Sequence, residues 1–283
     1  MRPEERTLAQ LEYSPTPVLK SNSDRKAEAW SKVPQVTLVF WIIKILATTL
    51  GETGGDAVSM TLNLGYAVAS LIFLGFFAIT LAAQVSSKRY HPFIYWAVVV
   101  ATTTVGTTVS DYLDRTLELG YVKSSVMLLC GVILVLILWR RFAGRIQFEN
   151  ITTTKDEIFY WVTILVSNTL GTALGDFVAT TTGLGFERGA LVFGSLIALV
   201  AALHFFTKIS ASVLFWAAYV LTRPLGATLG DTLTKSHMEG GMGLSRITSS
   251  LVIAGLMIVG IALASKRDER IRGASEREQA YSR

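Results

Sequence analysis

Four aspartates are the residues whose type and spacing point most directly to chemistry. Asp56, Asp111, Asp176 and Asp231 each follow a glycine by five residues and a tryptophan by fifteen. They end long apolar stretches, where a carboxylate is costly unless it is paired, hydrated or coordinating a cation. We therefore expect the four side chains to converge on a polar path that binds a cation or carries protons. The alternative is that each aspartate caps a helix backbone or binds a neighbouring hydroxyl at the outer rim of a membrane.

Other oxygen-bearing side chains lie close to these aspartates along the chain. Glu52 precedes Asp56 by four residues, which places both on one helical face. Thr49, Thr104 and Asn168 lie two or three residues before a motif glycine, and their oxygens could act as further ligands. Alternatively, the threonine hydroxyls donate back to carbonyls of their own helix.

The charges within the apolar segments predict a cation site. The four aspartates and Glu52 give five negative charges, whereas Lys44 and Arg223 give two positive charges, which leaves a remainder of −3. Bound cations, protons or both would offset this remainder, because close carboxylates do not all stay ionised. Oxygen ligands without paired cysteines or histidines favour Mg²⁺, Ca²⁺ or Mn²⁺, so the aspartates are candidate metal ligands. Lys44 and Arg223 would tune the affinity as counter-ions, or would simply form salt bridges.

The aspartates belong to an internal repeat. Each copy has an aromatic residue and a tryptophan, then a glycine, then the aspartate. Successive aspartates are 55, 65 and 55 residues apart, so a two-helix hairpin was duplicated and the pair was duplicated again. The fourth copy is the loosest, since Gly-Met-Gly-Leu stands where the others have Leu-Gly and an aromatic residue. The aligned copies are residues 40–56, 95–111, 160–176 and 215–231.

Composition indicates that membrane-spanning helices carry these motifs. Of the 283 residues, 51% are apolar and 17% are charged, which is too few charges to coat a soluble protein of this length. This excludes a secreted disulfide-rich protein, a nucleic-acid-binding module and a disordered chain. We expect an all-α integral membrane protein, in which Pro224 breaks or kinks the seventh helix. The eight predicted spans are residues 37–58, 64–84, 93–113, 122–139, 158–178, 187–206, 211–232 and 246–265.

Basic residues orient these spans. Lysine and arginine number 19 on the side of the termini, 5 on the opposite side and 2 within spans. By the positive-inside rule both termini are cytoplasmic, which an even number of spans satisfies. The five residues on the opposite side are Arg115, Lys123, Arg188, Lys235 and Arg246. The predicted membrane domain, 33–265, divides into repeats 33–87, 88–150, 151–207 and 208–265, between polar cytoplasmic tails at 1–32 and 266–283.

The direction of the hairpins predicts the architecture. All four enter and leave from one side, so the repeats are parallel and are related by an axis along the membrane normal. Odd-numbered spans are rich in threonine and glycine and carry the acids, whereas even-numbered spans are almost wholly apolar. We expect four inner helices within four lipid-facing helices, with pseudo-fourfold or nested twofold symmetry. If the tryptophans mark the inner interface, the aspartates lie about 22 Å farther along each helix, in the outer third of the bilayer.

Small residues four apart in each motif predict close helix packing. This spacing lets two membrane helices approach and gain van der Waals contact. It explains the glycines but not the aspartate that follows each pair. The pairs are Gly51/Gly55, Gly106/Ser110, Gly171/Gly175 and Gly226/Gly230.

The sequence resembles a known family in the runs KVPQVTLVFWIIKILATTLGETGGD and TLGTALGDF. These runs are similar to bacterial "uncharacterised membrane-anchored" proteins, which are defined by a short hydrophobic repeat of unknown function. The resemblance covers about residues 32–265. It implies an integral protein of the bacterial inner membrane with tandem repeats, and it suggests a link to metal-ion export.

Together these features predict a transporter that exports a divalent, Mn²⁺-like cation, with proton coupling through Glu52 or the aspartates. A cation channel is one alternative, and a non-transporting scaffold, in which the motif only packs helices, is another. An enzyme is not expected, because no nucleophile–histidine pair, histidine cluster or phosphate-binding loop stands out. No cofactor or nucleic-acid partner is expected. The expected partners are the transported cation, the lipid bilayer and further copies of the chain in a homo-oligomer.

Overall fold

The computed structural model describes residue 34 and residues 36–87, 90–144, 146, 151 and 153–281, with the backbone alone at residue 212 and at 271–281. The predicted N-terminal tail, 1–32, and the basic residues Lys88, Arg89 and Arg145 lie outside the described residues. All regular structure in the described part is helical, which confirms the all-helical fold class. Its long helices are α3 Leu38–Asp56, α4 Gly65–Ser86, α5 Pro92–Asp111, α6 Tyr121–Ala143, α7 Thr154–Asp176, α8 Phe186–Phe206, α9 Ala211–Thr234 and α10 Arg246–Tyr281.

Most of these helices are suited to cross a membrane. Among the described residues, seven helices are long and apolar enough to do so, and α9 is not one of them because Arg223 and Pro224 lower its hydropathy. Helix α9 runs through Pro224 as one element, so the predicted break is not found. A proline removes only one helical hydrogen bond, and α7 packs against this point because Gly171 and Gly175 lie beside Pro224.

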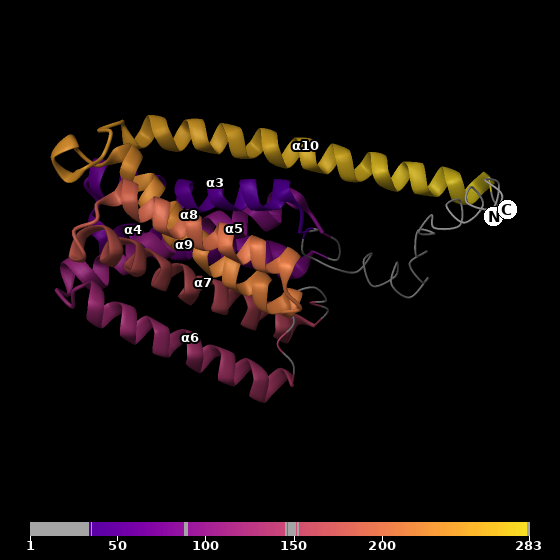
Figure 1. The fold of residues 1–283 in the computed structure, drawn as a ribbon, viewed down its shortest axis with the longest axis horizontal. Helices are drawn as coiled ribbons and strands as arrows, with labels where there is room; N and C mark the ends of the chain where they lie inside the picture. Colours follow the sequence, from indigo (N-terminus) through magenta and orange to yellow (C-terminus); the bar gives the residue numbers. More distant parts are fainter. Residues whose placement is uncertain are drawn as a thin grey trace, which may run out of the picture.

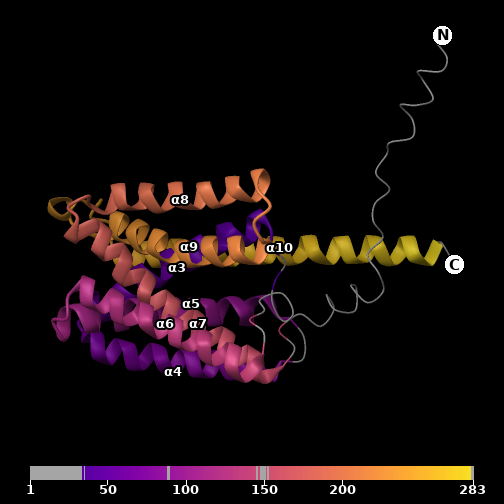
Figure 2. The same ribbon diagram turned by 60° about the horizontal axis from the view of Figure 1, so that its bottom comes forward.

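Helices α3, α5, α7 and α9 form a closed inner ring. Figure 1 and Figure 2 show the long helices side by side, with their axes roughly aligned. Helix α3 packs against α5 and α9, and α7 packs against the same two helices. The four run in one direction, because their aromatic residues meet at one end and their aspartates lie at the other. Between 56% and 72% of the apolar window is buried in α3, α5 and α7, against at most 28% in α4, α6, α8 and α10. The helices therefore divide into inner and outer sets, as their compositions predict.

Each outer helix packs against the inner helix of the following repeat rather than that of its own. Helix α4 packs on α5, α6 on α7 and α8 on α9. The last outer helix, α10, returns to the first repeat and packs on α3, where Ser250 Oγ donates to Thr53 Oγ1 at 2.9 Å. The four repeats are therefore interlocked in a circle, and the end of the chain completes the packing of its beginning.

The connections after the inner helices differ between the first three repeats and the fourth. Three inner helices continue past their aspartate as π-helical turns, η1 Ala57–Thr61, η2 Tyr112–Thr116 and η3 Phe177–Thr181. The glycine of the following Leu-Gly-aromatic sequence then has a φ of 73° to 78°, which favours glycine. In the fourth repeat the α-helix continues to Thr234, and Lys235 begins a loop that contains one 3₁₀ turn, η4 His237–Glu239.

Helix α10 is the longest element, with 36 residues from Arg246 to Tyr281. At 1.5 Å per residue it measures about 54 Å, well beyond the thickness of a hydrocarbon layer. Its C-terminal half therefore projects past the other helices (Figure 1). The predicted C-terminal tail starting at residue 266 is thus a continuation of this helix through residue 281.

Candidate functional site

The motif glycines bring the inner helices into direct contact. A Cβ atom on the first glycine of each motif would press into the residue three positions before the equivalent glycine of the next repeat. The same contact recurs around the whole ring, including the step from the fourth repeat back to the first. The contacts join Gly51 to Thr103, Gly106 to Asn168, Gly171 to Arg223 and Gly226 to Thr48.

In three of the four motifs, the second small residue lies beside the residue that directly follows the first glycine of the next motif. The contacts join Gly55 to Thr107, Gly175 to Ala227 and Gly230 to Glu52. Ser110, the one non-glycine residue at this position, donates its hydroxyl to the carboxylate of Asp114 at 3.3 Å. The small residues therefore place a ring of side chains, Glu52 among them, at close helix contacts.

Arg223 lies where the four inner helices meet and is fully buried. Its Nη2 lies 3.1 Å from Oε2 of Glu52 on α3 and 2.6 Å from the hydroxyls of both Thr107 on α5 and Thr172 on α7. Thr107 also donates to Oε2 of Glu52 at 3.1 Å. One side chain from α9 thus binds all three other inner helices, and it fills the middle of the ring.

The four aspartates form two pairs, each with a shared basic side chain. In the first pair, Lys235 Nζ lies 3.3 Å from Oδ2 of Asp56 and 3.3 Å from Oδ1 of Asp231. Arg246 Nε lies 3.5 Å from the same Asp56 oxygen. Burial alone would lower the pKa of Lys235, but the carboxylates of Asp231 and Asp56 outweigh it, and the net direction is upward. An ammonium that is charged at neutral pH therefore holds the two aspartates together.

Arg115 joins the second pair. Its Nε lies 3.2 Å from Oδ1 of Asp111, and its Nη2 lies 3.8 Å from Oδ2 of Asp176. Its Nη1 also donates to the hydroxyl of Tyr66 at 3.1 Å. The second and fourth repeats thus each supply a base that binds their own aspartate and that of the next repeat, which is a nested twofold relation.

These bases change the charge balance. Arg115, Lys235 and Arg246 raise the bases at the inner helices to five, against the four aspartates, Glu52 and two further buried acids, Asp114 and Glu157. The predicted remainder of −3 is therefore wrong, because these three side chains turn into the site instead of remaining in the connections. The available signal was the spacing of four residues that separates Arg115 and Lys235 from a motif aspartate.

One group of carboxylates is close enough to share a metal ion. Oxygens of Glu52, Asp56 and Asp231 all lie within 4.8 Å of one another, and each residue is at most 2% exposed. In the described part of the chain, no such group includes Asp111 or Asp176. Of the four predicted aspartate ligands, only Asp56 and Asp231 therefore join Glu52 in such a group, whereas Asp111 and Asp176 pair with Arg115.

The predicted neutral ligands make other hydrogen bonds. The hydroxyls of Thr49 and Thr104 donate to carbonyls one turn back on their own helices, at 2.9 and 3.0 Å. The amide of Asn168 donates to the hydroxyl of Thr102 at 3.0 Å. These contacts match the alternative in which such side chains form hydrogen bonds within and between helices and do not bind an ion. The hydroxyl that does reach Glu52 belongs to Thr107.

Lys44 lies toward the aromatic end of the ring. Its Nζ is buried without a hydrogen-bond partner in the described part of the chain, and it lies 4.0 Å from the centre of the Tyr219 ring. Such a cation–π contact differs from the predicted role as a counter-ion to the acids. Trp96 and Trp161 are only 3% and 1% exposed. They therefore pack inside the ring.

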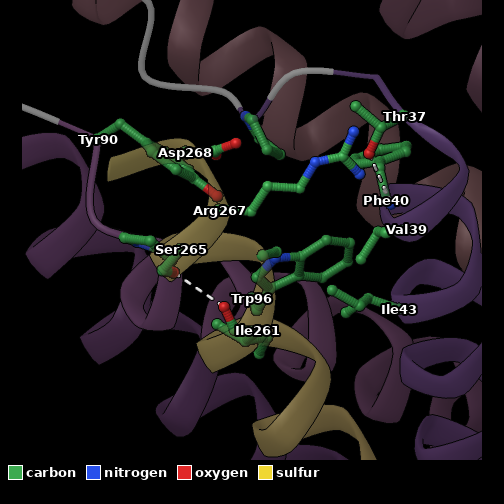
Figure 3. Close-up of a pocket in the computed structure, with 13 residues that line it drawn as sticks. Thr37, Val39, Phe40, Ile43, Tyr90, Trp96, Ile261, Ser265, Arg267 and Asp268 are labelled. Carbon is green, nitrogen blue, oxygen red and sulfur yellow. Dashed lines mark hydrogen bonds between the residues drawn. The ribbon is translucent and has the colours of Figure 1, made fainter. Parts of the chain in front are cut away.

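A cavity of about 90 Å³ lies at the aromatic end, between α3, α5 and α10. Figure 3 shows the side chain of Arg267 reaching across it above Trp96 toward Thr37. The cavity lies near the starts of the inner helices, whereas the carboxylates lie at their ends. It is therefore separate from the cluster of Glu52, Asp56 and Asp231.

Comparison with known families identifies the repeat. A family model described as "Repeat of Unknown Function (DUF347)" matches residues 39–90, 94–145, 159–210 and 214–269. These stretches cover well over half of the chain, and each takes in most of one inner helix and most or all of the outer helix that follows. No curated protein and no solved structure matches the chain.

Proposed function

The chain belongs to the DUF347 repeat family, and from this premise we propose that it is a multi-pass membrane protein that transports a cation through its inner ring. All eight helices, α9 included, would cross the bilayer. The carboxylate cluster formed by Glu52, Asp56 and Asp231 is the observation on which the proposal rests. Intramembrane acids that face a bundle interior commonly line substrate or ion pathways.

This carboxylate cluster suits a hard divalent cation. Carboxylate oxygens are ligands that Mn²⁺, Mg²⁺ and Ca²⁺ prefer. Three carboxylates buried within 4.8 Å of one another need compensating positive charge. Arg223 and Lys235 supply that charge here, at 3.1 and 3.3 Å, and a transported cation would supply it when the carboxylates turn toward the ion.

A carrier fits the closed ring better than an open channel does. Arg223 fills the centre of the ring, and aromatic side chains from all four inner helices meet at one end. A cation therefore needs a rearrangement to pass. We place the protein in a bacterial inner membrane with cytoplasmic termini, because basic residues are in excess on the side of the termini. We propose export as the direction of transport on the family resemblance alone.

Ion flux into proteoliposomes tests the proposal. Mn²⁺, Mg²⁺, Ca²⁺, K⁺ and Na⁺ are compared as substrates, with protein-free liposomes as the baseline. Asp231→Asn and Asp56→Asn should each lower divalent flux about tenfold or more per folded molecule. Asp176→Asn, at the same motif position in the other pair, is the matched control and should retain most of the flux. Flux equal to the baseline for every ion, or equal loss in all three variants, would contradict the proposal.

The ion pairs favour one second candidate, a non-transporting scaffold. A base binds each of the four aspartates and Glu52, and the motif glycines make close helix contacts. In a scaffold the ion pairs would serve only to hold the helices. The aspartate variants would then lose thermal stability in both pairs alike, and the wild type would give no flux.

A further inference from the structure

Lys235 occupies the place where the fourth repeat departs from the other three. In the first three repeats a π-helical turn follows the motif aspartate directly. In the fourth, the α-helix continues for three residues beyond Asp231 and Lys235 starts a glycine-rich loop instead. The repeat whose sequence matches the others least well therefore contains the segment with this lysine.

The loop holds the backbone of Lys235 while its side chain enters the site. The amide of Gly243 donates to the carbonyl of Lys235 at 2.8 Å, and Gly241 lies so close to that carbonyl that a Cβ would overlap it. The side chain is 5% exposed and reaches Asp56 and Asp231. The ammonium of Lys235 therefore reaches from the loop at the aspartate end of the ring into the carboxylate cluster.

We propose that the ammonium of Lys235 is an internal counter-ion that the transported divalent cation displaces, and that its return neutralises the empty site. This inference rests on the proposed function. No bond forms or breaks and no proton is transferred: one cation leaves the carboxylates as another arrives. With Arg223 paired to Glu52, departure of the ion would otherwise leave Asp56 and Asp231 with Arg246 alone. An uncompensated carboxylate among packed helices is costly, so the returning ammonium allows the empty carrier to reorient.

The second aspartate pair provides an internal comparison. Arg115 binds Asp111, Asp176 and the Tyr66 hydroxyl through three different nitrogens. A guanidinium held in this way is fixed in geometry, whereas an ammonium is a point charge on a flexible stem. The Arg115 pair is therefore a permanent structural link, and Lys235 is the exchangeable one.

Two transport modes of the same proteoliposomes test this role. Net efflux of Mn²⁺ requires the empty carrier to return, whereas Mn²⁺/Mn²⁺ exchange does not. Lys235→Gln should lower net efflux about tenfold or more while it keeps exchange within about threefold of wild type. Arg115→Lys, which keeps a charge in the other pair, should leave the ratio of the two rates unchanged.

The outcomes separate this inference from the proposed function. If wild type moves no ion in either mode, the proposed function fails. If wild type transports and Lys235→Gln loses both modes equally, or keeps both, the counter-ion role is wrong. A second variant, Lys235→Arg, keeps the charge but binds the carboxylates with a wider fork. It should weaken Mn²⁺ binding about tenfold or more in equilibrium titration, and unchanged affinity would also overturn the proposal.

Discussion

Nη2 of Arg223 lies 3.1 Å from Oε2 of Glu52, and neither residue is more than 2% exposed. The pair joins the fourth repeat to the first, and two threonines from the second and third repeats bind the same nitrogen. Arg223 has no basic counterpart at the equivalent positions of the other repeats, which hold Thr48, Thr103 and Asn168. The symmetry of the ring is therefore broken at its centre by one ion pair.

Removing one member of this pair should destabilise the protein strongly. Glu52→Gln leaves the buried guanidinium without a compensating charge, and such losses cost about 3–5 kcal/mol in soluble proteins. The double variant Glu52→Gln/Arg223→Met removes both charges and should be more stable than Glu52→Gln alone. Denaturant unfolding in detergent micelles, arranged as a double-mutant cycle, measures the coupling. Additive effects of the two substitutions would show that the pair contributes nothing.

Alanine at the motif glycines should separate the inner helices. A Cβ on Gly226 would overlap Thr48, and one on Gly51 would overlap Thr103. Such overpacking typically costs about 1–3 kcal/mol, so Gly226→Ala and Gly51→Ala should each lower the melting temperature. Gly75 on α4 and Gly194 on α8 are matched controls, because a Cβ there meets no atom within 4 Å. Their alanine variants should match or exceed wild-type stability, and a similar loss at all four positions would contradict the packing assignment.

The sequence predicts the helices and the repeat well because both depend on local pattern. Apolar runs of bilayer length and a recurring Trp–Gly–Asp spacing can be read without knowledge of any contact. The inner position of the odd-numbered helices follows from their small residues. The exchange of outer helices between repeats cannot be predicted in this way, because α4 could pack on its own inner helix or on the next with the same amphipathic pattern.

The site is predicted only in part for a similar reason. Asp56 and Glu52 share a helix face, so their proximity follows from spacing. The pairing of Asp231 with Asp56 depends on Lys235. Because Lys235 follows the end of a predicted span, the sequence suggests only an ordinary basic residue in a connecting loop. Lys44 is the reverse case, since a buried lysine suggests an acid partner and the structure places an aromatic ring against it.

The loop that carries Lys235 should loosen in acid. Glu239 accepts hydrogen bonds from the hydroxyl and the amide of Ser236, at 2.7 and 3.3 Å, and these bonds lower the pKa of Glu239 from its ordinary value of 4.5. Because the folded pKa is depressed, this stabilisation is present above pH 4.5 and is lost as the pH falls through the folded value. The protection factor of the Ser236 amide, which compares its exchange rate with that of an unfolded peptide at the same pH, should fall below that pH when it is followed by NMR in micelles. Glu239→Gln should remove the acid transition, and an identical transition in this variant would assign it to another group.

Closure of the circle can be tested by a cross-link between the first and last repeats. The hydroxyls of Thr53 on α3 and Ser250 on α10 lie 2.9 Å apart, so cysteines at both positions should form a disulfide on mild oxidation. With a protease site inserted between α8 and α9, the cleaved fragments should stay joined until the disulfide is reduced. Ser250→Cys alone is the control for pairing with the native Cys130, which lies exposed on α6 and is on the other fragment after cleavage. Fragments that separate without reductant in the double variant, or that stay joined in the control, would mean that α10 does not complete the packing of α3.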